Sequence, residues 1–377
     1  MKKILVTGGA GFIGSFIVDL LIERGYSVRV LDNLTPQVHG ERKKEPPDYL
    51  NPKAEFILGD VRDPKACRKA LKDVYAVFHE AAAVGVGQSM YQIREYCEVN
   101  SLGTATLLQC IIDLPKGKKP EKIIVASSMS IYGEGAYQSS RGEVFYPHLR
   151  PIEQLKEKKW EMLSPDGKEM LNPIPTSENK LIQPQSIYAI NKQEQEEMVL
   201  NIGIAYQIPA VSLRYFNVYG PRQALSNPYT GIAAILSACF LNNSSPIIFE
   251  DGLQTRDFIH VKDIAVANLM ALENPSANYQ IFNVGTGRAI SVLKMAGFLR
   301  DLLGKKNIEI TFPGKFRAGD IRHCYADISK IKNILGFSPE IRFEDGIKDL
   351  VNWVKEQQSI SLSQKSLSEL EERGLTI

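Results

Sequence analysis

Residues 3–14 read KILVTGGAGFIG, a short apolar run that leads straight into three spaced glycines. The run over 3–7 predicts a strand that is buried on both faces. From residue 12 to residue 24, apolar side chains recur at helical spacing, and Gly25 predicts the end of that helix. The stretch therefore predicts a strand, a glycine-rich turn and a helix in immediate succession, which is how a βαβ unit begins.

The spacing of Gly8, Gly11 and Gly14 gives each glycine a physical task. Gly8 permits a tight turn, Gly11 lets the backbone approach a pyrophosphate, and Gly14 lets the helix pack closely on the strand. The amino end of the helix offers N–H groups and a partial positive charge to phosphates. A plain βα turn would also explain three glycines, so the interpretation needs a second signal.

Asp32 is that second signal. It ends the second predicted strand, eighteen residues after Gly14. An acid at this place can accept hydrogen bonds from an adenosine ribose, and it favours NAD over NADP because it repels a 2′-phosphate. The alternative is a solvated loop aspartate. Asp60 and Val61 follow the third strand and residues 81–83 follow the fourth, so we expect them at the same ligand-binding edge of the sheet.

Strand and helix patterns alternate through the first half of the chain. We expect further strands over 27–31, 55–58, 76–79, 122–127 and 211–215, and helices over 64–71, about 91–114 and 187–206. This alternation predicts an α/β fold, a doubly wound parallel sheet of the Rossmann kind, over residues 1–220. Shorter mixed elements predict a smaller substrate-binding lobe over 221–357 that exchanges segments with the first domain, and a polar tail over 358–377.

The composition is that of an ordinary globular chain. Of 377 residues, 44% are hydrophobic and 23% are charged, and 45 Lys and Arg nearly balance 43 Asp and Glu. The formal net charge of +2 gives no support for nucleic acid or an anionic membrane as partner, and no apolar run reaches the about 18 residues of a membrane span. Five scattered cysteines without a CxxC spacing predict a reduced, cytoplasmic protein with neither a disulfide framework nor a metal site.

A second constellation follows the fifth predicted strand. SSMSIYG occupies 127–133, and YAINK occupies 188–192 within a predicted helix. The spacing of Tyr188 and Lys192 puts phenol and ammonium on one helix face. A nearby cation stabilises phenolate, so we expect the pKa of Tyr188 to fall and the phenol to act as a base toward an alcohol, assisted by a serine hydroxyl. The alternative is a surface tyrosine and lysine.

With these motifs the chain resembles the extended short-chain dehydrogenase/reductases of the NDP-sugar epimerase/dehydratase group. The resemblance spans about residues 3–355. It is carried by TGGAGFIG at 7–14, GDVRD at 59–63, HEAAA at 79–83, VNSLGT at 99–104, SSMSIYG at 127–133, YAINK at 188–192, RYFNVYGPRQ at 214–223, TRDFIHVKDI at 255–264, FNVGTG at 282–287 and RAGDIRHCYAD at 317–327.

The resemblance implies a role for individual residues. The catalytic residues would be Ser128, Tyr188 and Lys192. The NAD-binding residues would be Gly8, Gly11, Phe12, Ile13, Gly14, Asp32, Asn33, Asp60, Val61, Ala81, Ala82, Ala83, Asn100, Tyr188 and Lys192, with Asn100 holding the active-site helix. The substrate-binding residues would be Ser128, Met129, Ser130, Tyr188, Asn217, Arg256, Arg317, Asp320 and Cys324, with the two arginines on the diphosphate.

The resemblance also narrows the reaction. In the 4,6-dehydratases of this group an Asp-Glu pair directly follows the catalytic threonine, whereas Met129 and Ser130 stand at those places here. This departure favours a 4-epimerase, in which Tyr188 removes the 4-OH proton while the C4 hydride passes to NAD and later returns to the other face. Cys324 is small, which implies room for a larger sugar.

Two stretches, 31–40 and 214–235, resemble dTDP-L-rhamnose 4-epimerases, which would convert dTDP-L-rhamnose to dTDP-6-deoxy-L-talose. A UDP-glucose or UDP-N-acetylglucosamine 4-epimerase, a reductase of an NDP-4-keto-sugar and a nucleotide-sensing regulator stay open as alternatives. Relatives often carry a cysteine knuckle in the long segment before Tyr188. No cysteine lies between residues 111 and 238 here, so we expect no metal there.

The last expectations concern the long segment before Tyr188 and the two long predicted helices. We interpret 142–184 as a lid or wall over the sugar site, with a surface excursion as the alternative. Related enzymes pair two long helices, here 91–114 and 187–206, into a four-helix bundle. The resemblance therefore implies a homodimer, although an apolar stripe on the second helix could equally belong to the core.

Overall fold

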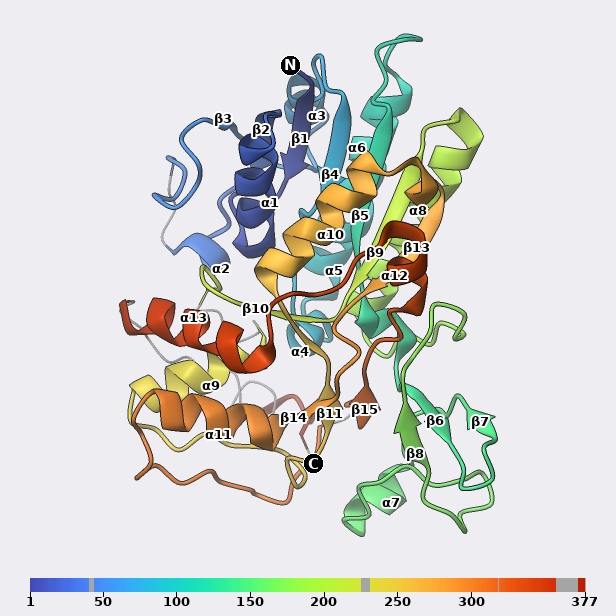
Figure 1. The fold of residues 1–377 in the computed structure, drawn as a ribbon, viewed down its shortest axis with the longest axis vertical. Coiled ribbons are helices and arrows are strands. Elements are labelled where there is room, and N and C mark those ends of the chain that lie inside the picture. The colour runs from blue at the N-terminus through green and yellow to red at the C-terminus, as the bar shows by residue number, and fades with distance from the viewer. Residues whose placement is uncertain (41–43, 225–230, 318, 357–371, 377) are drawn as a thin grey trace.

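A computed structural model describes residues 1–40, 44–224, 231–317, 319–356 and 372–376. Its centre is a seven-stranded sheet in which every neighbouring pair is parallel (Figure 1). The strand order is β13 (Gln280–Val284), β9 (Ala210–Tyr215), β5 (Lys122–Ser128), β4 (Ala76–His79), β1 (Lys3–Thr7), β2 (Ser27–Asp32) and β3 (Glu55–Leu58). The predicted doubly wound α/β fold is confirmed.

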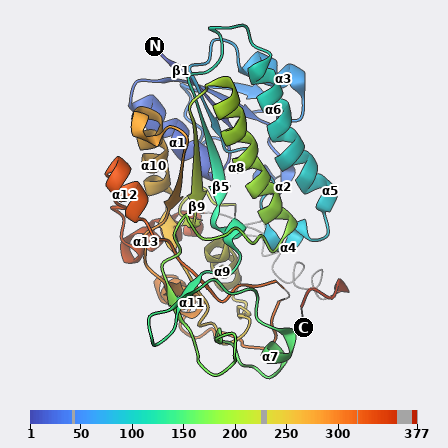
Figure 2. The same cartoon turned by 90° about the vertical axis from the view of Figure 1, so that its right-hand side faces the viewer.

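Helices cover both faces of the sheet, as Figure 2 shows edge-on. On one face α1 (Phe12–Glu23) and α10 (Val261–Glu273) pack against Val6 of β1 and Ile124 of β5. On the other face lie α3 (Pro64–Ala70), α6 (Gly103–Ile112) and α8 (Ile187–Tyr206). Because apolar side chains of each strand face both helix layers, the strand sequences are continuously apolar and do not alternate between apolar and polar residues.

The helix expected over 91–114 is not one regular helix. It consists of α5 (Ile93–Tyr96), a π-helical stretch over Cys97–Leu102 and α6. Short π-helical stretches inside α-helices often occur at functional sites because they re-aim single side chains. Here the stretch contains Asn100, which reaches the loop after β4. The short helices α2 (Pro36–His39) and α4 (Val86–Ser89) lie in the loops after β2 and β4.

A smaller lobe lies below the carboxyl ends of the strands in Figure 1. Its core joins α9 (Ile232–Leu241), α11 (Val292–Leu302) and α13 (Phe343–Glu356) around Phe240, Leu299 and Leu350. Two small sheets complete the lobe. They comprise β10 (Asn217–Tyr219) with β12 (Phe258–His260), and β14 (Ile290–Ser291) with β11 (Thr255–Arg256) and β15 (His323–Cys324).

Segments beyond residue 220 also return to the main sheet. Strand β13 is its seventh strand, and α10 packs on α1. Helix α12 (Ser329–Leu335) and a single 3-10 turn at Pro275–Ala277 lie beside them. The division of the chain into domains at residue 220 stays a prediction. Within the described residues, no helix has the length and apolar character that a membrane crossing requires.

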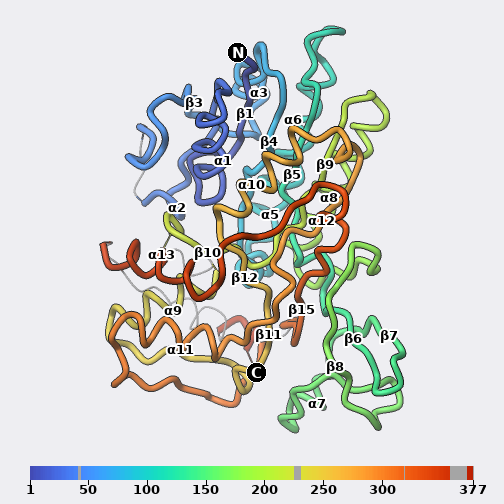
Figure 3. The backbone as a smooth tube through the Cα atoms, in the orientation of Figure 1, coloured from blue at the N-terminus to red at the C-terminus, as the bar shows by residue number. Residues whose placement is uncertain are grey.

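The long segment before α8 forms a small unit of its own, at the lower right of Figure 3. It contains α7 (Ile152–Lys156) and an antiparallel sheet of β7 (Val144–Phe145), β6 (Ala136–Gln138) and β8 (Asn172–Ile174). Two buried arginines fasten it to the lobe. Arg150 pairs with Glu250 at 2.8 Å, and Arg322, which is fully buried, bonds to Glu161, Glu250 and Asp251.

Candidate active site

A cavity of about 780 Å³ opens at the carboxyl edge of the sheet, between the sheet and the lobe. The predicted site residues that line it are Gly8, Gly11, Phe12, Ile13, Gly14, Asp32, Asn33, Asp60, Val61, Ala81, Ala82, Ala83, Ser128, Met129, Ser130, Tyr188, Lys192, Asn217, Arg256, Arg317 and Asp320. The structure thus brings together residues that are far apart in the sequence, at the edge where ligands bind in open α/β sheets.

The glycine-rich turn is as tight as its spacing suggests. Gly8 has φ of +68°, and a Cβ there would lie 2.7 Å from the backbone nitrogen of Ala81. A Cβ at Gly14 would collide with the carbonyl oxygen of Gly8, whereas at Gly11 the nearest atom would be 3.2 Å away. Gly8 and Gly14 therefore maintain close backbone packing, and Gly11 is left beside the cavity.

Asp32 lies next to this turn at the end of β2. Its Oδ2 accepts the N–H of Ala10 at 3.0 Å, and its Oδ1 accepts the N–H of Leu34 at 2.9 Å. His39 lies 3.9 Å from Oδ1. Burial raises the pKa of Asp32, while the two N–H groups and His39 oppose that rise. The carboxylate lines the cavity beside the glycine turn, where it can accept hydrogen bonds from an adenosine ribose while the turn lies close enough for a diphosphate to approach.

The three predicted catalytic residues meet deeper in the cavity. Ser128 ends β5, and Tyr188 and Lys192 lie one turn apart on α8, whose first turn is capped by Ser186. The Ser128 hydroxyl accepts the N–H of Ser130 at 3.1 Å, and its effect on the pKa of Tyr188 places it beside the phenol. Lys192 Nζ donates to the carbonyl oxygen of Ala126 at 2.9 Å. A base, a hydroxyl partner and a cation thus share one wall of the cavity.

The pKa of Tyr188 differs from the expectation. Burial raises it to about 12, and only the hydrogen bond with Ser128 opposes that rise. Burial also lowers the pKa of Lys192 to about 8. The expected lowering of the Tyr188 pKa by Lys192 is therefore not found. The protein's own groups leave the phenol protonated, so a positive charge bound beside it is needed to favour phenolate.

The substrate-binding residues differ in how free their polar groups are. Asn217 Oδ1 is buried in the cavity wall and has no hydrogen-bond partner among the residues that the structure describes, so it is available to a ligand. Arg256 is engaged with backbone, since its guanidinium donates to the carbonyl oxygens of residues 255, 321 and 322. Arg317 is more exposed and pairs with Asp320 at 2.8 Å. Of the two arginines, Arg317 can reach a diphosphate with fewer bonds to break.

Two predicted residues do not line the cavity. Asn100 is buried behind it, where its side chain bonds both the N–H and the carbonyl of Ala83. It positions the wall rather than touching a ligand. Cys324 is 1% exposed and packs with Met129 in a separate apolar cluster. The expectation that Cys324 sets the width of the sugar pocket is corrected, because Met129 stands at the wall in its place.

Comparison with known proteins agrees with this geometry. The model of the NAD dependent epimerase/dehydratase family matches residues 4–160 and 164–285. The chain is 36% identical to a dTDP-L-rhamnose 4-epimerase from Burkholderia thailandensis over 94% of this chain and 96% of that protein. It is 38% identical to a putative UDP-glucose 4-epimerase from Methanocaldococcus jannaschii over 93% of this chain and 98% of that protein.

A solved structure shows the same architecture. UDP-glucuronic acid 4-epimerase from Bacillus cereus, crystallised with UDP-glucuronic acid and NAD, matches with a TM-score of 0.74 and 28% identity, covering 94% of this chain and 99% of that one. The chain belongs to the NAD dependent epimerase/dehydratase family. It is an NAD-dependent epimerase of nucleotide sugars, and the predicted family, enzyme class and cofactor are confirmed.

The long segment is not the lid of this epimerase. None of residues 142–184 lines the cavity. Its apolar side chains Phe145, Met162 and Leu171 pack with Tyr137 in a cluster of their own. The bonds of Arg150 to Glu250 and of Arg322 to Glu161 attach the segment to the lobe. The segment supports the lobe from outside. The expectation of a lid or wall over the sugar site is therefore corrected.

Sequence reasoning missed two contributions to the site. Glu80 lines the cavity, and an acid directly after a buried strand, inside the HEAAA motif, could have drawn attention. The end of the chain also returns to the cavity. Leu375 lines it, Thr376 pairs with Arg317 as an antiparallel bridge, and Arg373 lies 4.3 Å from the ring centre of Tyr91. A tail had been expected there, and residues 357–371 and 377 lie outside the described part.

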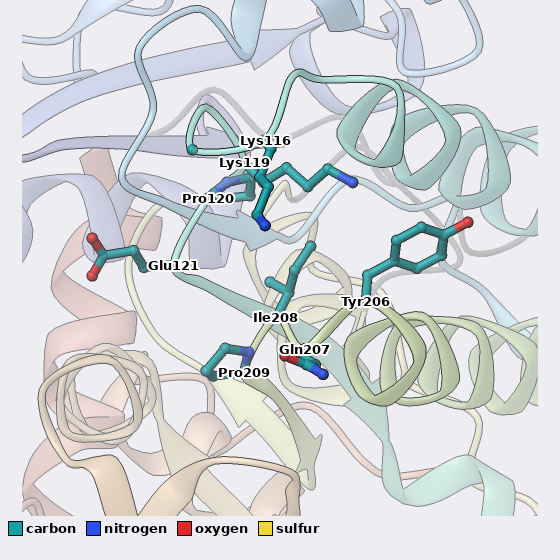
Figure 4. A pocket seen from close by; sticks show the side chains of 9 residues that line it. Lys116, Lys119, Pro120, Glu121, Tyr206, Gln207, Ile208 and Pro209 are labelled. Carbon is teal, nitrogen blue, oxygen red and sulfur yellow. The ribbon is translucent and has the colours of Figure 1, made fainter.

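A second cavity, of about 640 Å³, lies at the opposite edge of the sheet (Figure 4). It is formed before β5 and after α8, and Lys119 lies 4.7 Å from the ring centre of Tyr206 there. Figure 4 shows the side chain of Glu121 pointing away from the two lysines that border it. No predicted site residue reaches this hollow, so the chemistry belongs to the first cavity.

Proposed function

We propose that the chain is a 4-epimerase that converts dTDP-L-rhamnose to dTDP-6-deoxy-L-talose. The observation that carries this proposal is the wall beside the catalytic pair. Ser128 and Tyr188 line the same cavity, and the two residues after Ser128, Met129 and Ser130, provide no acid or base. Eliminating water from a sugar needs such groups beside C5 and C6, whereas moving hydride at C4 needs only the tyrosine and the cofactor.

Each of the three catalytic residues has a defined task in this reaction. Tyr188 accepts the proton of the sugar 4-OH and returns it at the end of the cycle. Ser128 donates a hydrogen bond to the same sugar oxygen and keeps it directed at the phenol. Lys192 supplies positive charge on the cofactor side of the wall. When bound, NAD supplies the acceptor and the donor of the C4 hydride, so the net redox change is zero.

The proposed sugar follows from the apolar character of the wall. Met129 is 8% exposed and lines the cavity directly after Ser128. A thioether side chain suits the C6 methyl group of a 6-deoxy sugar. A C6 hydroxyl at the same place would lose its hydrogen-bond partners, at about 1–3 kcal/mol. The similarity to the Burkholderia thailandensis dTDP-L-rhamnose 4-epimerase supports the same choice.

The alternative substrates and the reductase alternative can be distinguished by the sugar that is produced and by whether NADH is consumed. The purified protein is incubated with catalytic NAD and, in parallel, with dTDP-L-rhamnose, UDP-glucose and UDP-N-acetylglucosamine, and the released sugars are analysed. We expect a 6-deoxytalose product from dTDP-L-rhamnose without net NADH formation. A kcat/KM for UDP-glucose equal to or above that for dTDP-L-rhamnose would defeat the substrate choice. In a separate incubation with NADH and an NDP-4-keto-sugar, stoichiometric consumption of NADH would indicate a reductase.

We also propose that the enzyme is a cytoplasmic homodimer that pairs α5, the π-helical stretch and α8 with those of a second copy. Ile93, Leu102, Ile190 and Ile204 on these elements are 39–64% exposed, although all four are apolar. Burying them against a second copy would remove that surface from water. Five cysteines without a disulfide are consistent with a reducing compartment. Sedimentation at micromolar concentration tests the dimer, and a monomer there would refute it.

A further inference from the structure

Two glutamine side chains join loops that leave the sheet on either side of the glycine-rich turn. Gln37 lies in α2, which follows β2, and Gln88 lies in α4, which follows β4. In the sheet β1 lies between β4 and β2, and the glycine-rich turn follows β1. The two loops therefore flank the turn on which we expect the diphosphate of NAD.

The two side-chain amides bond to each other in both directions. Nε2 of Gln37 donates to Oε1 of Gln88 at 2.8 Å, and Nε2 of Gln88 donates to Oε1 of Gln37 at 3.3 Å. A bond that joins the loops after β2 and β4 has to cross the carboxyl end of β1. Here it does so along the cavity, because both glutamines line the same cavity as the turn.

The two ends of this bridge differ in how firmly they are held. Gln88 is 6% exposed, and its Oε1 also accepts the hydroxyl of Tyr96 at 3.0 Å. Tyr96 is 1% exposed, and its ring makes an edge-to-face contact with Tyr188 at 6.5 Å between the ring centres. Gln37 is exposed, so water can compete for its bonds. The bridge therefore has a fixed end on α4 and an end on α2 that can open.

The surroundings of Gln37 make the bond to Gln88 important for the position of α2. None of the four residues of α2 is buried, so apolar packing restrains this helix only weakly. Neither amide can give or take a proton near neutral pH, so the pair has no part in acid-base chemistry. What the bond can do is hold the loop after β2 against the loop after β4.

We propose that Gln37 and Gln88 form a latch across the NAD site, which slows both the entry and the release of the cofactor. An epimerase gives back the hydride that it takes, so its turnover does not require NAD to be exchanged. Because the latch consists of the protein's own groups, it has to open for passage in either direction. The inference concerns the cofactor and does not depend on which sugar is converted.

The test measures NAD exchange without any sugar substrate. Protein loaded with NAD is mixed with an excess of isotope-labelled NAD, and mass spectrometry of the bound cofactor gives the release rate. Rapid mixing of NAD-free protein with NAD gives the entry rate. In Gln37→Ala we expect both rates to rise by about 5-fold, because the open state no longer competes with the amide bonds, while the dissociation constant stays nearly the same. Gln37→Asn, whose amide is one methylene shorter, should behave like Gln37→Ala.

Two further variants separate the latch from general effects of losing a glutamine. Gln88→Ala removes the other half of the bond, and the double variant with Gln37→Ala should be no faster than the faster single variant, because one latch is lost only once. Gln138→Ala is the matched control. It loses a 3.0 Å hydrogen bond to the carbonyl oxygen of Gly142, away from the cavity, and should exchange NAD at the native rates.

Each other outcome overturns the inference. Native exchange rates in Gln37→Ala would show that the bond does not restrain the cofactor. Faster release with unchanged entry would show that Gln37 contacts NAD directly. Effects of Gln37→Ala and Gln88→Ala that multiply in the double variant would show that the two residues act independently. Faster exchange accompanied by a lower unfolding temperature would indicate a general loosening of the fold.

Discussion

Asn100 brackets the backbone of Ala83 with both ends of its side-chain amide. Oδ1 accepts the N–H of Ala83 at 2.8 Å, and Nδ2 donates to its carbonyl oxygen at 3.0 Å. Asn100 is fully buried in the π-helical stretch, and Ala83 lines the cavity. The helix after β4 thereby holds the loop that forms part of the NAD-binding wall.

Replacing Asn100 by Ala should loosen this wall. The backbone groups of Ala83 lose both partners, and we expect the free energy of unfolding to fall by about 2 kcal/mol. NAD affinity should fall as well, because the loop is no longer held. Chemical denaturation and NAD titration measure the two effects. Asn201→Ala, at an exposed position on α8, is the control and should change stability by less than about 0.5 kcal/mol.

Asp32→Ala tests the ribose site. A charge-assisted contact is lost, so NAD affinity should weaken by about 1–3 kcal/mol, measured by calorimetry. Asp166→Ala removes an exposed carboxylate from the long segment, away from the cavity, and should leave NAD affinity unchanged. Equal NAD affinity in Asp32→Ala and the native protein would mean that the carboxylate only bonds its own turn.

Removing residues 372–377 tests the proposed binding site for the nucleotide sugar. Leu375 lines the cavity and Thr376 pairs with Arg317, which faces the proposed diphosphate position. A chain that stops before residue 372 should therefore show a raised KM for the nucleotide sugar while its NAD affinity stays the same. Leu375→Ser, which keeps the bridge, should raise the KM less. If the shortened chain keeps the native KM, the terminal residues do not form part of the sugar site.

The attachment of the long segment should depend on pH. Burial would raise the pKa of Glu161, but hydrogen bonds from His323 and Arg322 outweigh it and lower the pKa to about 2. A carboxyl group whose pKa is lower in the folded state than in the unfolded state stabilises the fold. This stability is fully present when the pH is above the unfolded-state pKa, and it is lost as the pH falls toward the folded-state pKa. We therefore expect about 2–3 kcal/mol from Glu161 near neutral pH, disappearing between about pH 5 and about pH 2.

Denaturation of Glu161→Gln against the native protein at several pH values measures this contribution. The difference in unfolding free energy should shrink as the pH falls. Glu157→Gln, at an exposed position in the same segment, should show little difference at any pH. A difference for Glu161→Gln that stays constant down to low pH would indicate lost packing rather than lost charge.

Part of this site could be predicted from the sequence because it depends on residues that are close together in the chain. The glycine spacing, Asp32 and the pair Tyr188 and Lys192 each follow from what a turn or a helix face requires, and the structure gathers them in one cavity. Strand runs buried on both faces likewise gave the sheet, because their apolar character does not depend on what packs against them.

The rest depends on long-range packing. Whether Cys324 or Met129 stands at the wall is decided by how the lobe docks, and the same holds for the return of Leu375. The Tyr188 pKa was misjudged because burial, which the sequence does not reveal, outweighs charge. Glu80 was overlooked because its hydrogen-bond partner, Tyr215, lies more than one hundred residues further along the chain.

Turnover of Tyr188→Phe tests the central claim most directly. The ring and its edge-to-face contact with Tyr96 remain, and only the oxygen that moves the proton is lost. With the nucleotide sugar that the native enzyme converts best, we predict retained fold and NAD binding and a kcat lower by about 10²- to 10⁴-fold. A kcat equal to that of the native enzyme would contradict the assignment of Tyr188 as the base.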